Sequence, residues 1–248
     1  MSRLDNRTPS TARETAGADR RVAGRVAVAA TAVTAGSVLV LLIALTFEMK
    51  WGPALRIDNA ARDDLHQYGL AHPQFTAFMQ GVSAVSGAAG WQVVSVIAIV
   101  WLLLRRRFRE AAFVLVANAG SSLLNTVLKD LVHRHRPVVT HPFLHAPGQS
   151  FPSGHAQAAA TGFTVLFFVL WPHLHSPWMR RAMIGGAVAA TLLIGYSRVA
   201  LAAHFASDVV AGYIVGVAWT ISIAAAFHVW PRHAVATSER ELLRSARH

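Results

Sequence analysis

Six segments of the chain contain no Asp, Glu, Lys or Arg, and they restrict the folds open to it. A helix needs about 20 residues to cross roughly 30 Å of hydrocarbon, and these segments are 16 to 24 residues long. A soluble helical bundle would need polar faces that such runs do not offer. We therefore predict an all-α integral membrane protein with six transmembrane helices. They are residues 26–47, 81–104, 111–128, 156–172, 182–197 and 209–227.

The net charge of +11 raises the question of a nucleic-acid partner, so the positions of the basic residues matter. If both termini are cytoplasmic, the cytoplasmic segments carry 16 of the 23 Lys and Arg residues. This asymmetry obeys the positive-inside rule. Membrane topology accounts for most of the basicity, and no nucleic-acid partner is expected. The absence of Cys excludes disulfides and cysteine nucleophiles.

The chain divides into three parts. In residues 1–25 the apolar residues do not recur at a regular spacing, and this segment is expected to form a disordered cytoplasmic tail. Residues 26–230 are expected to form the six-span domain, and residues 231–248 a cytoplasmic C-terminal tail. The run 26–47 exceeds the apolar region of a signal peptide, about 7 to 15 residues, and is interpreted as a retained span. A short helix on the outer surface is expected between the first two spans, with Trp51 and Tyr68 as interface anchors.

Three cations stand at the outer ends of the predicted spans, where burial is costly unless they meet an anion. They are Lys129, Arg136 and Arg198. The fourth span begins nearby with Ser153, an N-cap candidate, and Gly154. The free N–H groups and dipole of that helix favour a phosphate, which Gly154 would allow to approach closely. Together these residues predict a site for a polyanion.

Two histidines lie beside this predicted anion site. Asp208 follows His204 by four residues and could accept a hydrogen bond from one ring nitrogen, leaving the other free to attack. His155 could supply the proton that a leaving oxygen needs. Ser207 is the expected N-cap of the sixth span. The candidate catalytic residues are therefore His204, His155 and Asp208.

Three stretches of the sequence carry a family resemblance. The stretch "KDLVHRHRP" fits Lys-x6-Arg-Pro, "PSGH" is unaltered, and "SRVALAAHFASD" fits Ser-Arg-x5-His-x3-Asp. The chain thus resembles the type 2 phosphatidic acid phosphatase superfamily over about residues 75 to 220. The resemblance implies metal-independent cleavage of a phosphate ester or anhydride through a phosphohistidine, with no cofactor.

The resemblance also implies a role for each matching residue. His204 resembles the nucleophile, Asp208 its partner, and His155 the acid that later activates water. The remaining matches resemble the phosphate clamp: Lys129, Arg136, Ser153, Gly154 and Arg198. Four further histidines in the same outer loop, at positions 133, 135, 141 and 145, lack compact ligand spacing and are not expected to bind a metal.

The expected function is hydrolysis of a lipid phosphate or diphosphate, phosphatidic-acid-like or undecaprenyl diphosphate, at the outer leaflet of a bacterial plasma membrane. Two alternatives stay open. The protein could transfer the phosphoryl or head group to an alcohol, or it could bind a lipid phosphate without catalysis. A role like that of the soluble haloperoxidases that share the motifs is disfavoured by six spans. The sequence does not indicate an oligomeric state.

Overall fold

The computed structural model describes residues 9–227, which form eight α-helices, one short 3-10 helix and no β-strand. The predicted all-α class is thus confirmed for this part of the chain. The elements are α1 (Pro9–Glu48), α2 (Gly52–Ala71), α3 (Pro73–Val85), α4 (Ala88–Leu104), α5 (Phe108–Val132), α6 (Gly154–Leu170), η1 (Trp171–His173), α7 (Pro177–Ala200) and α8 (Ala206–Ala226).

Five helical segments are long and apolar enough to cross a membrane. They are Val22–Glu48 in α1, Phe108–Val132, Gly154–His173, Pro177–Ala200 and Ala206–Ala226. The expected span 81–104 is instead broken, because α3 and α4 meet at a bend of 41°. Ser86 ends α3, and Gly87 adopts an extended conformation before α4. The described residues therefore hold five spans, or six if this bent pair counts as one.

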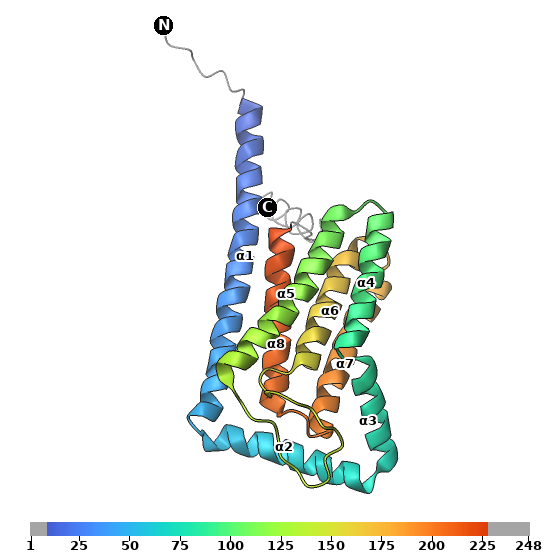
Figure 1. Ribbon diagram of the computed structural model, residues 1–248. Coiled ribbons are helices and arrows are strands. Elements are labelled where there is room, and N and C mark those ends of the chain that lie inside the picture. Colours follow the sequence, from blue (N-terminus) through green and yellow to red (C-terminus); the bar gives the residue numbers. More distant parts are fainter. Residues whose placement is uncertain (1–8, 228–248) are drawn as a thin grey trace, which may run out of the picture.

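Helix α2 lies across one end of the bundle, here called the α2 end, while the long helices stand side by side (Figure 1). It is the expected helix between the first two spans, and at 20 residues it is longer than a short surface helix. Trp51 and Tyr68 are exposed, as interface anchors would be. Helix α1 begins and α8 ends at the opposite end of the bundle (Figure 1).

The two predicted tails are described only in part. Helix α1 begins at Pro9, so residues 9–25 continue the first span as a helix where we expected no regular structure. Ala and Arg, which favour helix, are frequent there. Residues 1–8 and the C-terminal tail lie outside the described residues.

Helices α6 and α8 pack closely because two glycines of α8 face α6. A Cβ at Gly212 would lie 2.7 Å from the carbonyl oxygen of Ser153, and one at Gly216 would lie 2.6 Å from that of Gln157. Glycines four residues apart allow helices to approach in this way inside a membrane. The start of α6, which carries the "PSGH" stretch, is thereby held against α8.

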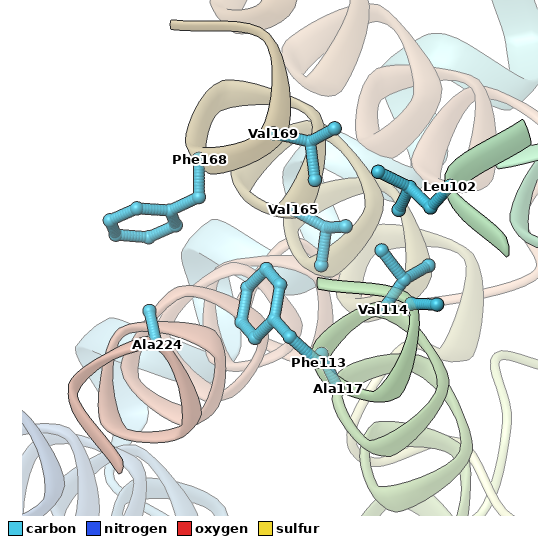
Figure 2. Close-up of a cluster of buried hydrophobic side chains, with 9 residues drawn as sticks. Leu102, Phe113, Val114, Ala117, Val165, Phe168, Val169 and Ala224 are labelled. Carbon is cyan, nitrogen blue, oxygen red and sulfur yellow. The ribbon is translucent and has the colours of Figure 1, made fainter. Parts of the chain in front are cut away.

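An apolar cluster joins α4, α5, α6 and α8 at the opposite end of the bundle. Phe113 lies at its centre, edge-on to Phe168 with ring centroids 6.1 Å apart (Figure 2). The remaining members are Leu102, Ala111, Val114, Ala117, Val165, Val169 and Ala224. Apolar side chains thus hold these four helices together at this end of the bundle.

Candidate active site

All three motif stretches meet at the α2 end of the bundle (Figure 1). Lys129 lies in the last turn of α5, "PSGH" begins α6, and Arg198 lies in the last turn of α7. His204 occupies the short connection from α7 to α8. The loop 133–153 runs between α5 and α6 and supplies Arg136. Segments far apart in the sequence therefore build one polar site.

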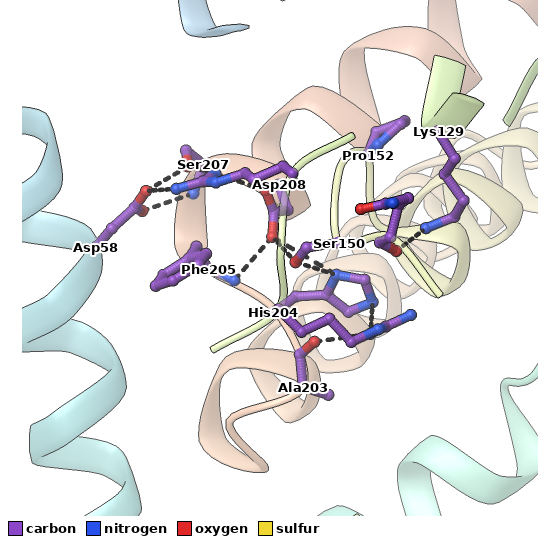
Figure 3. Close-up of polar contacts among 12 residues, drawn as sticks. Asp58, Lys129, Ser150, Pro152, Ala203, His204, Phe205, Ser207 and Asp208 are labelled. Carbon is purple, nitrogen blue, oxygen red and sulfur yellow. Dashed lines mark hydrogen bonds and ion pairs between the residues drawn. The ribbon is translucent and has the colours of Figure 1, made fainter. Parts of the chain in front are cut away.

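His204 and Asp208 are both buried, with 2% and 0% of their side chains exposed. The Nδ1 atom of His204 lies 3.6 Å from Oδ2 of Asp208, an ion-pair distance that exceeds an ordinary hydrogen bond. The Ser150 hydroxyl lies beside both groups. It donates to Asp208 Oδ2 at 2.5 Å and lies 3.4 Å from His204 Nδ1 (Figure 3). The predicted pair is thus brought together, with Ser150 as a third member.

The other ring nitrogen of His204 faces Arg136. Nη1 of Arg136 lies 3.1 Å from His204 Nε2 and donates to the carbonyl oxygen of Ala203 at 2.8 Å. A guanidinium can only donate, so Nε2 must be the accepting, unprotonated nitrogen. The ring proton then belongs on Nδ1, next to Asp208 and Ser150. This tautomer leaves a lone pair on Nε2.

Burial lowers the pKa of His204 to about 4, and the charges of Arg136 and Arg198 act in the same direction. The neighbouring carboxylate of Asp208 opposes this change. Burial also lowers the pKa of Arg136. The His204 imidazole is therefore neutral near pH 7, as a nitrogen nucleophile must be.

The three predicted cations reach the site from three segments. Lys129 Nζ donates to the carbonyl oxygen of Gln149 at 2.6 Å. The charges of Arg136 and Arg198 both act on Lys129, so the cations share one region. Arg198 is only 4% exposed and donates through Nη1 to the Ser83 hydroxyl. Its Nε is buried and has no hydrogen-bond partner among residues 9–227.

Ser153 is the N-cap residue of α6, but its side chain makes no capping hydrogen bond. Its backbone N–H donates to the carbonyl oxygen of Asp208 at 3.0 Å. Its hydroxyl is fully buried and has no partner within the described chain. Gly154 follows, where a Cβ would lie 3.3 Å from Asn125 Oδ1. The Ser153 hydroxyl is therefore free for a ligand.

His155 lies in the first turn of α6, beside the backbone of Ser83. A Cβ at Gly87 would lie 3.5 Å from its Nε2, so the ring stands next to the break between α3 and α4. The charges of Arg198, His204 and Arg136 act on it. The second histidine is thus in the same site as the first.

The expected N-cap of α8 is wrong by two residues. Phe205 occupies the N-cap position, and its N–H donates to Oδ2 of Asp208 at 2.9 Å. Ser207 lies inside the first turn, where its hydroxyl donates to Asp58. An aspartate at the third helical position can accept a hydrogen bond from the N-cap N–H. Asp208 therefore makes the capping contact that we expected from Ser207.

Comparison with known proteins identifies the family. The chain is 31% identical over 150 residues to phosphatidylglycerophosphatase B of Bacillus subtilis, covering 59% of this chain and 72% of that protein. The family model of the PAP2 superfamily matches residues 110–232. The chain belongs to the PAP2 superfamily. The resemblance inferred from the three motifs is thereby confirmed.

Two further relatives bear on the PAP2 assignment. The chain is 31% identical over 147 residues to an undecaprenyl-diphosphatase of Sulfolobus acidocaldarius, covering 56% of this chain and 66% of that protein. Its fold matches the crystal structure of a transmembrane PAP2-type phosphatidylglycerolphosphate phosphatase from Bacillus subtilis, with a TM-score of 0.70 and 23% identity. That match covers 82% of this chain and 98% of the other. The prediction that the chain is an enzyme, a phosphatase of the PAP2 superfamily, is confirmed.

Sequence reasoning missed four polar residues of this PAP2 site. Ser150 and Arg134 lie in the loop that carries Arg136, and their nearness to the motifs was the only signal available. For Ser83 and Asp58 the sequence carried no such signal. Their burial depends on how α3 and α2 pack against α7 and α8, which no local pattern encodes.

The four loop histidines at positions 133, 135, 141 and 145 are exposed in the PAP2 fold. Within residues 9–227, no group of three or more His, Cys, Asp or Glu side chains is placed to hold a metal ion.

Proposed function

We propose that the protein is a membrane lipid phosphatase in which His204 forms a phosphohistidine. The observation that carries the proposal is the setting of the His204 ring. Its Nδ1 faces Asp208 and Ser150, while its unprotonated Nε2 faces Arg136. A neutral imidazole with a fixed tautomer, aimed at a group of cations, suits attack on a phosphorus atom.

In the first step, the Nε2 lone pair attacks phosphorus and the bond from phosphorus to the leaving oxygen breaks. His155 donates a proton to that oxygen, which leaves as the lipid alcohol or as a lipid monophosphate. In the second step, His155 accepts a proton from water as the water oxygen attacks the phosphohistidine. The bond between Nε2 and phosphorus breaks, and inorganic phosphate leaves.

The proposed clamp holds the phosphoryl oxygens through both steps. Its members are Lys129, Arg136, Ser153, Gly154 and Arg198. Two of their donors support this role directly, since Arg198 Nε and the Ser153 hydroxyl are buried and unpaired within the described chain. Donors fixed before the reaction stabilise transition-state charge without reorganising. Asp208 compensates the positive charge that the ring gains when it is phosphorylated.

The proposed substrate is a lipid phosphate monoester or diphosphate presented at the membrane surface. The site lies at the ends of apolar helices, so a phosphate could enter while its hydrocarbon tail stays in the bilayer. The relatives are named for phosphatidylglycerophosphate and undecaprenyl diphosphate, and both chemistries fit a histidine nucleophile. The charge asymmetry favours the outer leaflet of the plasma membrane.

Phosphate release from a lipid panel tests this function. Purified full-length protein would be assayed with phosphatidic acid, phosphatidylglycerophosphate and undecaprenyl diphosphate in the presence of a chelator. Turnover of at least one lipid is expected, and His204→Ala should abolish it. His145→Ala, which changes an exposed histidine of the site loop, is the matched control and should retain activity. Binding of a lipid phosphate without any release would instead identify a non-catalytic binder.

A further inference from the structure

Asp58 is a carboxylate of α2 that is only 5% exposed. Burying a carboxylate is costly unless it is paired and hydrogen-bonded. Asp58 accepts from Arg134 Nη2 at 2.8 Å, from the Ser207 hydroxyl at 2.5 Å and from the Ser207 N–H at 3.0 Å. That N–H belongs to the first turn of α8. Asp58 therefore caps α8 from another helix.

Arg134 bridges Asp58 and Asp208 with a single guanidinium. Its Nη1 donates to Asp208 Oδ1 at 2.6 Å, while its Nη2 is bonded to Asp58 (Figure 3). The rings of Phe47 and Phe205 also lie against the guanidinium, with centroids 4.2 and 4.3 Å from its central carbon. The two carboxylates and the two rings together leave Arg134 little freedom to move.

The bond from Arg134 decides which oxygen of Asp208 faces His204. Oδ1 is taken by Arg134, and Oδ2 accepts from Ser150 and from the Phe205 N–H. Oδ2 is also the oxygen that lies 3.6 Å from His204 Nδ1. Rotating the carboxylate would break all of these contacts. Without Arg134, two buried carboxylates would also stand close together with no cation between them.

We propose that Arg134 and Asp58 are positioning residues for the catalytic histidine, with Asp58 holding Arg134, Arg134 holding Asp208, and Asp208 orienting His204. The inference rests on the proposed function, in which His204 is the nucleophile. It makes α2 part of the catalytic apparatus, because the first member of the series comes from this helix. A helix outside the candidate spans thereby controls a side chain at the site.

The His204 ring itself provides a test that needs no substrate. Full-length protein with 15N-labelled histidine would be examined by NMR in detergent, and His204→Ala would assign the ring signal. The Nδ1 signal should move in Asp58→Asn and in Arg134→Gln. It should stay in place in Asp63→Asn, which removes a carboxylate of the same helix that is 56% exposed. If Asp58→Asn folds and its Nδ1 signal does not move, the proposal is overturned. Asp58→Asn alone decides the test if Arg134→Gln fails to fold.

Kinetics provide the second test. Mutating the outer hydrogen-bond partner of a metal-bound histidine typically costs about 10- to 100-fold in activity, and we expect the same range for the partners that orient His204. We expect kcat to fall about 10-fold in Asp58→Asn and about 100-fold in Arg134→Gln, with KM changed less than about threefold. Arg134 acts through Asp208 in this proposal. Adding Arg134→Gln to Asp208→Asn should therefore lower kcat by less than about threefold further. If the kcat of the double variant falls by the product of the two single-variant effects, the inference is contradicted. If wild-type protein releases no phosphate but the NMR signals move as expected, the proposed function fails and the positioning stands.

Discussion

The guanidinium of Arg136 lies 3.1 Å from Nε2 of His204, and this contact fixes the chemistry of the ring. Because arginine only donates, the nitrogen that it meets must carry a lone pair. The same nitrogen is the one proposed to attack phosphorus. A cation beside the attacking atom also lowers the tendency of that atom to take a proton.

The pH dependence of His204 follows from its burial. Its pKa in the folded protein, lowered to about 4, is below the roughly 6.5 of an unfolded histidine. As pH falls from about 6.5 to 4, the unfolded state binds the proton first, so folding stability decreases across that window. Above it the ring is neutral in both states. NMR titration of the His204 signal should give a midpoint near 4, and a midpoint near 6.5 would contradict the structure.

Replacing Ser153 should separate function from stability. Its hydroxyl makes no hydrogen bond within the described chain, so Ser153→Ala breaks no hydrogen bond among these residues. We expect an unchanged or slightly higher melting temperature and a fall in kcat/KM of about 10-fold or more, because a phosphate donor is lost. Ser121→Ala is the contrasting variant. The Ser121 hydroxyl bonds Thr161 and Gln157, and its loss should cost about 1 kcal/mol of stability.

Gly212 should tolerate no side chain. Gly212→Ala would place a Cβ 2.7 Å from the carbonyl oxygen of Ser153 and push the start of α6 away from α8. Overpacking of this kind costs about 1–3 kcal/mol, and the displaced "PSGH" stretch should lower kcat/KM. Gly185→Ala in α7 meets nothing within 4 Å and is the matched control. Equal melting temperatures and equal activities for the two variants would refute the packing argument.

The chain contains no Cys, so single cysteines can report its orientation. His141 is exposed in the loop at the α2 end, and Arg109 is exposed at the start of α5, at the opposite end. If the site faces the outer surface, as proposed, a membrane-impermeant maleimide should label His141→Cys in intact cells and Arg109→Cys only after lysis. The reverse pattern would place the site on the cytoplasmic side.

The spans and the motif residues could be predicted because each rests on a local pattern. Uncharged runs indicate the spans, and the spans then carry Lys129, Ser153 and His204 to one end of the bundle. The broken span and the Asp58–Arg134 network could not be predicted in this way. The first depends on Ser86 and Gly87 ending a helix inside an apolar run. The second depends on contacts from α2 to the start of α8, which are set by tertiary packing.

The proposed covalent intermediate can be measured directly. Full-length wild-type protein and His155→Gln would be mixed with a lipid substrate carrying a 32P-labelled terminal phosphate, quenched in alkali, and examined by mass spectrometry. The account predicts a phosphoryl group on His204 in wild-type protein. Both its formation and its loss should be slower in His155→Gln, because His155 is the acid of the first step and the base of the second. Phosphate release without any labelled protein, or a label on another residue, would contradict it.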